Sequence, residues 1–225
     1  MEDFRKEVAT MRFLSHPNIV QFFGAYLQEQ PFMLINEFMP GGSLEKLQEN
    51  KVMLSQKKTL KYARDVAAGM TYLHSYDPPV IHRDLKPGNL LLDRCLSASH
   101  RTQLTSGFLL IDARSLLKHL DLFTFSFQMF SKNVCKICDF GLARVRSRGD
   151  ATKTYSMTGE TGSYRYMAPE VFRHAKYNEK VDQYSFAIVV WEMLEGTMYL
   201  PYLKAIDVAY SSEAGHRYTI RLIPF

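Results

Sequence analysis

The sequence has few cysteines and no long apolar run. Only three of its 225 residues are cysteine, too few to predict the disulfide framework of a small secreted protein. Cys135 and Cys138 form a C-x-x-C pair, but residues three positions apart on a strand point to opposite faces, which disfavours a shared metal or redox site. No apolar run approaches the roughly 18 residues of a membrane span. These absences predict a soluble, cytoplasmic protein with no membrane span.

The sequence also has no acidic surplus, because its formal net charge is +5. Much of that charge is local, since residues 94–133 hold five Lys or Arg side chains and only two Asp side chains. We find no basic stripe with interleaved aromatic side chains, the pattern typical of a nucleic-acid interface. The length of 225 residues and a hydrophobic content of 46% predict one domain with a single core and no nucleic-acid partner.

One polar loop between two apolar runs carries the strongest chemical signal. Residues 80–93, VIHRDLKPGNLLLD, predict a strand, a loop and a second strand. The loop holds the carboxylate of Asp84, the ammonium of Lys86 and the carboxamide of Asn89, and the proline and glycine between them allow a sharp turn. A carboxylate can accept the proton of an attacking hydroxyl, an ammonium can neutralise a transferred group, and an amide oxygen can ligate magnesium. The loop therefore predicts phosphoryl transfer.

The H-R-D-x-K-x-x-N pattern of this loop resembles the catalytic loop of eukaryotic protein kinases. Three further stretches resemble the same family and follow the same order: F-x-x-E-V-x-x-M-x-x-L-x-H-P-N-I-V over 4–20, D-F-G over 139–141 and A-P-E over 168–170. The resemblance covers residues 3–93 and 134 to about 220. It implies a partial kinase domain of α+β class, with an incomplete N-terminal lobe over 1–38 and a mainly helical C-terminal lobe over 39–225.

The resemblance implies a role for each motif residue. Asp84 orients the substrate hydroxyl and accepts its proton, Lys86 stabilises the γ-phosphoryl group, and Asn89 holds Mg²⁺ together with Asp139. The ATP site implied in the same way draws on five residues of separate stretches: Glu7, Glu37, Met39, Ser43 and Leu91. Glu37 and Met39 offer backbone groups to the adenine, and Ser43 lies near the ribose.

The first helix carries an acid within its apolar stripe. Apolar side chains recur at helical spacing over residues 3–14, namely Phe4, Val8, Met11 and Leu14. Glu7 lies among them, and a carboxylate on a buried face needs a cation, so Glu7 predicts a partner unless it is simply an exposed helix acid. In the family this glutamate pairs with a lysine on the preceding strand. That strand and the glycine-rich loop have no match here, which implies an N-terminally truncated domain.

The other elements follow from periodicity and caps. Strands are expected over 19–26 and 32–38, a hairpin followed by an N-cap at Ser43. Residues 55–75 predict a long amphipathic helix with Ser55 as its cap. A strand over 134–138 and an apolar helix over 181–195, ended by Gly196, complete the set. By the resemblance, Asp182 ties the catalytic loop to this last helix, and Glu170 pairs with Arg217.

Residues 94–133 interrupt the family pattern. A short turn is expected between the two strands, whereas about 40 residues separate Asp93 from Val134. The segment is rich in Leu, Phe and Ser, poor in acids and without proline, unlike a solvated loop. Three explanations stay open: an insertion with a helix near 115–122, an interaction element that presents phenylalanines, or translated non-coding sequence. We favour the last, because removing the segment would restore a short turn.

A hydroxyl-rich stretch follows the D-F-G tripeptide. Residues 142–166 mix hydroxyl and basic side chains, which predicts a flexible, phosphorylatable loop. An upstream activating kinase that phosphorylates Thr158 or Thr161 would order this loop by pairing the phosphate with Arg83, a hypothesis that alanine at both threonines tests. The alternative is a merely solvated loop.

Two features indicate the subtype of kinase. Lys86, two residues after Asp84, resembles the serine/threonine type, and residues 159–170, GETGSYRYMAPE, resemble the tyrosine-kinase-like group with its Raf-like and mixed-lineage kinases. The resemblance implies an enzyme that transfers the γ-phosphoryl group of ATP to protein hydroxyls in signal transduction. The alternative is a catalytically impaired kinase-like fragment that acts only as a binding module.

Overall fold

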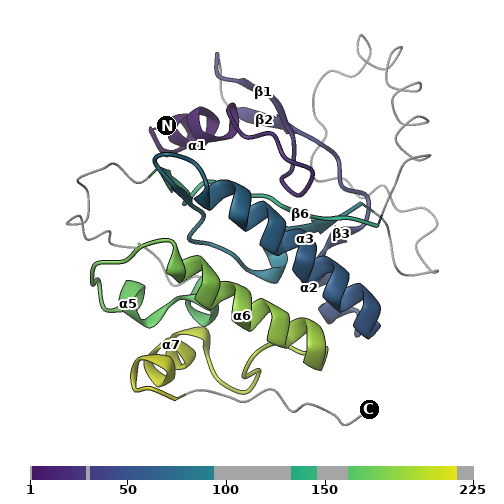
Figure 1. Cartoon of the computed structure of the whole chain (residues 1–225), viewed down its shortest axis with the longest axis vertical. Coiled ribbons are helices and arrows are strands. Elements are labelled where there is room, and N and C mark those ends of the chain that lie inside the picture. The colour runs from purple at the N-terminus through teal and green to yellow at the C-terminus, as the bar shows by residue number, and fades with distance from the viewer. Residues whose placement is uncertain (1, 29–30, 94–132, 146–161, 217–225) are drawn as a thin grey trace.

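The computed structural model describes four stretches of the chain: residues 2–28, 31–93, 133–145 and 162–216 (Figure 1). Most of the segment 94–133 lies outside these stretches, and so do Thr158, Thr161 and Arg217. None of the helices in the described stretches is long and apolar enough to cross a bilayer.

One end of the molecule consists of a helix and a two-stranded hairpin (Figure 1). The elements are α1 (Glu2–Met11), β1 (Phe22–Tyr26) and β2 (Met33–Asn36), and the two strands pair antiparallel. The helix ends three residues before the predicted limit. Leu14 donates its N–H to the carbonyl of Met11 at 3.1 Å, a tighter turn that leads toward Pro17 and still leaves Leu14 buried.

A small sheet lies at the centre and connects distant parts of the chain. Its three antiparallel strands run in the order β3 (Gly42–Ser43), β5 (Leu90–Leu92) and β6 (Cys135–Ile137), and a separate pair joins β4 (Val80–Ile81) to β7 (Arg144–Val145). Asp93 and Val134, which flank the segment 94–133, meet in this sheet. The Asp93 N–H donates to the carbonyl of Val134 at 3.1 Å, and the Val134 N–H donates to Asp93 Oδ1 at 2.8 Å. The two strands therefore pair as they would across a short turn.

The other end of the molecule is helical, and α3 and α6 lie side by side across its middle (Figure 1). The elements are α2 (Leu44–Glu49), α3 (Gln56–His74), the 3₁₀ helices η1 (Pro87–Asn89) and η2 (Gly162–Tyr166), α5 (Pro169–Phe172), α6 (Lys180–Glu195) and α7 (Ala205–Glu213). Ser43 caps α2 as predicted, because its Oγ accepts the Lys46 N–H at 3.3 Å. Ser55 stands at the N-cap of α3 without a side-chain hydrogen bond. Gly196 ends α6 with φ +67°, as predicted.

The core explains how these elements hold together. Leu90 and Leu92 of β5 are fully buried with Val66 and Leu73 of α3 and Val189 of α6, so one apolar cluster fixes the central sheet to the two long helices. The α+β class is confirmed, because the described stretches hold both helices and paired strands.

A buried arginine joins η2 to the chain before α7. Arg165 is 7% exposed. Its guanidinium donates to the carbonyl of Tyr199, to that of Leu200 at 2.6 Å and to that of Leu203 at 2.8 Å. Several carbonyl dipoles therefore replace the water that the charge would otherwise bind.

Gly69 lets α3 approach β6 closely. A Cβ at this position would lie 2.8 Å from Ile137 Cδ1 and 3.0 Å from the carbonyl oxygen of Asn18, and that same oxygen accepts the Ile137 N–H at 2.9 Å. A methyl group would thus push the helix away from the strand that leads into D-F-G.

We expect Gly69→Ala to lower the free energy of unfolding by up to about 2 kcal/mol. Alanine gains about 1 kcal/mol of helix propensity, but overpacking of a tight core costs about 1–3 kcal/mol. Urea unfolding followed by the fluorescence of the single tryptophan, Trp191, measures the change. Gly24→Ala is the matched control, since among the described residues no atom beyond its chain neighbours lies within 4 Å of its added Cβ. Equal stability of the two variants would contradict the close-contact argument.

Candidate active site

Asp182 anchors the loop that carries the H-R-D motif. Its carboxylate is 1% exposed and accepts the backbone N–H groups of His82 at 3.0 Å and Arg83 at 2.8 Å. It also lies 2.8 Å from His74 Nε2 of α3. The predicted tie between Asp182 and the catalytic loop is confirmed. Arg83 has a φ of +70°, a left-handed conformation that costs free energy in a residue with a side chain and that these hydrogen bonds hold in place.

His82 connects the loop to the D-F-G tripeptide. Its ring is fully buried and packs edge-on against Phe140 with the ring centroids 5.1 Å apart. Nδ1 accepts the Asp84 N–H at 3.3 Å, and Nε2 lies 3.1 Å from the carbonyl of Cys138. Since a carbonyl can only accept, Nε2 carries the ring hydrogen. The ring thus sets the backbone of Asp84 relative to the residue before Asp139.

The three polar groups predicted from the sequence converge in space. Lys86 Nζ lies 2.7 Å from Asp84 Oδ2, and the Asn89 amide donates to Asp84 Oδ2 at 3.0 Å and to the Asp84 carbonyl at 2.8 Å. Lys86 Nζ also donates to Ser163 Oγ of η2 at 3.0 Å. No described residue donates to Asp84 Oδ1, so one carboxylate oxygen stays available to accept a proton.

Asp139 and Glu7 form the acidic side of the site. Asp139 is exposed, has a φ of +62° and accepts the Gly141 N–H at 3.2 Å. Glu7 is half-buried and bonds to the backbone of Phe140. Burial raises the pKa of Glu7, and the charge of Asp139 raises that pKa further. No Lys or Arg among the described side chains pairs with Glu7, so its partner there is a backbone N–H rather than the predicted cation.

Asn89 and Asp139 provide a donor set that fits a hard cation. The Asn89 side-chain oxygen receives no hydrogen bond from the described residues, and the Cys138 N–H donates to the Asn89 carbonyl at 3.0 Å, next to Asp139. The described residues contain no group of three or more His, Cys, Asp or Glu side chains that could hold a metal. Two protein oxygens suffice for Mg²⁺, which usually keeps waters and takes phosphate oxygens as its other ligands.

Two of the residues predicted to line an ATP site, Ser43 and Leu91, lie on one face of the central sheet. Ser43 stands opposite Leu91 across β3 and β5, and Leu91 is half-buried between the fully buried Leu90 and Leu92. Because directly opposed side chains share a face, Ser43 and Leu91 are brought together on the side away from the core. Met39 is buried, and its carbonyl accepts the Gly42 N–H at 3.1 Å.

Glu37 has contacts that the sequence reasoning missed. Its carboxylate pairs with Lys136 Nζ at 2.7 Å, and its backbone N–H donates to the carbonyl of Gln21 at 2.8 Å. The contact of Ser163 with Lys86 was missed as well. Lys136 carried a usable signal, since it is a charged residue in the otherwise apolar run of β6. The same reasoning that singled out Glu7 would have singled out Lys136.

The C-x-x-C cysteines have little thiolate character. Burial raises the pKa of the Cys135 thiol well above its usual range. Burial, together with the charges of Asp139 and Asp84, raises the pKa of Cys138 to about 12. Because the thiolate is the metal ligand and the nucleophile, both side chains act as small apolar residues here.

Comparisons with known proteins agree with the geometry of the site. Residues 1–222 match the family described as "Protein tyrosine and serine/threonine kinase". Over 98% of its length the chain is 40% identical to "Serine/threonine-protein kinase VIK" of Arabidopsis thaliana, of which it spans 42%. It is 35% identical to "Serine/threonine-protein kinase STY46" over 92% of the chain and 29% of that protein, and 35% identical to "Serine/threonine-protein kinase CTR1" over 86% and 19%, both of Arabidopsis thaliana. The chain thus spans less than half the length of these relatives.

Proposed function

The chain belongs to the protein tyrosine and serine/threonine kinase family, and from this premise we propose that it transfers the γ-phosphoryl group of ATP to serine or threonine hydroxyls of protein substrates. One observation carries the proposal. Asp84, Lys86 and Asn89 meet within hydrogen-bonding distance in a loop whose backbone the buried Asp182 holds in place. A loop held in this way positions its catalytic groups before the substrate arrives, which is most of what phosphoryl transfer requires.

Each polar group of the loop has a part in the reaction. The substrate hydroxyl approaches Asp84 Oδ1, which orients it and accepts its proton. Lys86 is held by Asp84 at 2.7 Å and offers its ammonium charge to the transferred group. Asn89 orients Asp84 through its amide hydrogens, which leaves its oxygen for the metal.

The acidic side of the site would hold the metal that accompanies ATP. Asn89 and Asp139 are the ligands that we propose for Mg²⁺, which when bound neutralises charge on the phosphates. Glu7, whose pKa is raised beside Asp139, adds negative potential at the same place. Glu37 and Met39 offer backbone groups to the adenine, and Ser43 and Leu91 line the sugar and base from the face of the sheet that they share.

Binding of Mg²⁺-ATP to the purified chain is the first test. At a free concentration of about 100 times Kd, binding to the folded state alone adds about 2.7 kcal/mol to the free energy of unfolding, which a thermal-shift assay detects. We expect this stabilisation with Mg²⁺-ATP and little of it with ATP and a chelator, because without a cation the Asp139 carboxylate would repel the phosphates.

The second measurement separates an enzyme from a binding module. The chain is incubated with γ-labelled ATP and a mixture of peptides that contain serine, threonine or tyrosine, and the label on each residue type is counted. Transfer to serine and threonine supports the proposal. Stabilisation without transfer would replace it with a kinase-like binding module, and absence of both would rule out nucleotide binding by this chain.

A further inference from the structure

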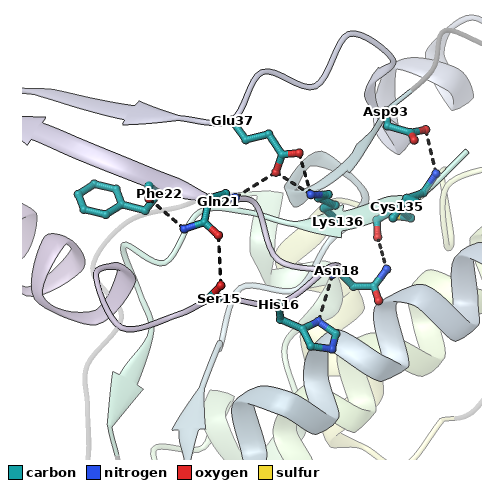
Figure 2. Close-up of polar contacts among 10 residues, drawn as sticks. Ser15, His16, Asn18, Gln21, Phe22, Glu37, Asp93, Cys135 and Lys136 are labelled. Atoms are coloured by element: carbon teal, nitrogen blue, oxygen red, sulfur yellow. Dashed lines mark hydrogen bonds and ion pairs between the residues drawn. The ribbon is translucent and has the colours of Figure 1, made fainter. Parts of the chain in front are cut away.

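Lys136 is a charged residue in the middle of a buried strand. Its neighbours in β6, Cys135 and Ile137, are fully buried, whereas Lys136 points to the other face of the sheet. There its ammonium contacts both carboxylate oxygens of Glu37 at 2.7 Å (Figure 2). The two residues are 99 positions apart in the sequence, so this contact joins two distant parts of the chain.

Glu37 is held through its backbone as well as through its side chain. Its N–H donates to the carbonyl of Gln21 at 2.8 Å, and the Gln21 N–H donates back to Glu37 Oε2 at 3.1 Å (Figure 2). We call Gln21, Glu37 and Lys136 the hinge clamp, because they hold the start of the segment that links β2 to β3. The clamp fixes the position at which the chain leaves β2, and Met39 follows two residues later.

The ion pair of the hinge clamp is largely shielded from water. The side chain of Lys136 is 16% exposed and that of Glu37 is 8% exposed. An exposed ion pair contributes little to a structure, but removing one member of a shielded pair leaves an uncompensated charge and moves the groups attached to it. The backbone next to Glu37 is therefore sensitive to Lys136.

The clamp lies between the two halves of the proposed ATP site. Lys136 stands opposite Leu91 in the sheet, and Leu91 stands opposite Ser43, so all three side chains share one face. Lys136 also precedes Asp139 by three residues on the same strand and loop. The Lys136 side chain thus contacts the segment proposed for adenine, while Asp139 lies on the loop that follows β6.

We propose that Lys136 is a positioning residue for ATP: through Glu37 and Gln21 it holds the backbone of residues 37–39 in the position where adenine binds. The inference rests on the proposed function and deepens it. It requires Lys136 to affect the adenine end of the ligand more strongly than the phosphate end.

The test compares ligands that bind to different ends of the proposed ATP site. Equilibrium dissociation constants are measured for Mg²⁺-ATP, adenosine and Mg²⁺-pyrophosphate on the full chain and on K136M. We expect K136M to weaken Mg²⁺-ATP and adenosine by the same factor, about tenfold to hundredfold, because small misplacements of a positioning group have effects of this size. The affinity for Mg²⁺-pyrophosphate is expected to stay unchanged, and K136R is expected to restore most of the adenosine affinity.

Two further variants guard against simple loss of folding. E37Q/K136M leaves no unpaired charge, and the amide that replaces the Glu37 carboxylate can still accept the Gln21 N–H. This double variant therefore folds even where K136M does not, and it is expected to show the same loss of adenosine affinity. K61M is the matched control, because Lys61 forms a more exposed ion pair with Asp65 at 2.7 Å on α3, and it should bind adenosine as the unchanged chain does.

The outcomes separate the inference from the proposed function. If the unchanged chain binds none of the three ligands, the proposed function fails and the inference fails with it. If the unchanged chain binds Mg²⁺-ATP, and K136M and E37Q/K136M bind adenosine as tightly as the unchanged chain does, only the inference is overturned. A parallel loss of adenosine and pyrophosphate affinity would also overturn it, since that pattern reports general damage to the site.

Discussion

Asp84→Asn is expected to lower the turnover of phosphoryl transfer by about 10²- to 10⁴-fold, the range found when a positioned general base is removed. The exchange keeps the size of the side chain but removes the oxygen that would accept the substrate proton. In the unchanged chain, Lys86 and Asn89 contact Asp84 Oδ2 at 2.7 and 3.0 Å. The amide of the variant can still present its oxygen to both groups. We therefore expect the affinity for Mg²⁺-ATP to change little while turnover falls, which single-turnover kinetics with labelled ATP would measure.

Asp207→Asn is the matched control for that prediction. Asp207 is exposed in the first turn of α7, away from the loop, so the same loss of charge should leave turnover unchanged. Equal turnover of the Asp84 variant and the control, at equal stability, would remove Asp84 from the role of proton acceptor.

Asp182→Ala is expected to have the largest effect on stability, a loss of about 2–6 kcal/mol, because two buried N–H donors each lose an acceptor at a cost of about 1–3 kcal/mol. The backbone N–H groups of His82 and Arg83 would lose their acceptor, and a buried donor without a partner keeps its full desolvation cost. Arg83 would also lose the contact that holds its φ at +70°. Urea unfolding followed by the fluorescence of Trp191, which lies on α6 close to Asp182 in sequence, would report the loss.

A graded variant makes the Asp182 prediction sharper. Asp182→Asn keeps one oxygen and can still accept one of the two backbone hydrogen bonds, so we expect its loss to lie between zero and that of the alanine variant. If alanine costs less than about 1 kcal/mol, the value of a single ordinary hydrogen bond, the carboxylate does not anchor the loop.

Much of the architecture could be predicted because it depends on local patterns. The apolar periodicity of 55–75 and the glycine after Glu195 gave α3 and the end of α6 within one residue. The H-R-D, D-F-G and A-P-E stretches led to a protein kinase of serine/threonine type in the tyrosine-kinase-like, Raf-like group, a recognition that the family match and the relatives confirm.

The contacts of the site were less predictable because they depend on which strands become neighbours. Glu37 reaches Lys136 because Ile19 bridges to Ile137 of β6 and Gln21 bonds to Glu37, and no local pattern predicts that arrangement. Lys86 contacts Ser163 of η2. Ser163 lies in a stretch with many hydroxyl side chains, and the sequence did not indicate which of them would contact Lys86. Periodicity placed Glu7 correctly on a half-buried face, but a backbone N–H of Phe140 could not be foreseen as its partner.

Arg165 couples the local unfolding of η2 to that of the chain before α7. Its guanidinium cannot leave the carbonyls of Tyr199, Leu200 and Leu203 without facing an interior that offers no water. Local unfolding of η2, which carries the Ser163 that contacts Lys86, therefore requires the connection before α7 to unfold with it. The two segments therefore form a single cooperative unit. The free energy needed to open η2, and with it the contact of Ser163 with Lys86, includes that of unfolding a stretch about 40 residues after η2.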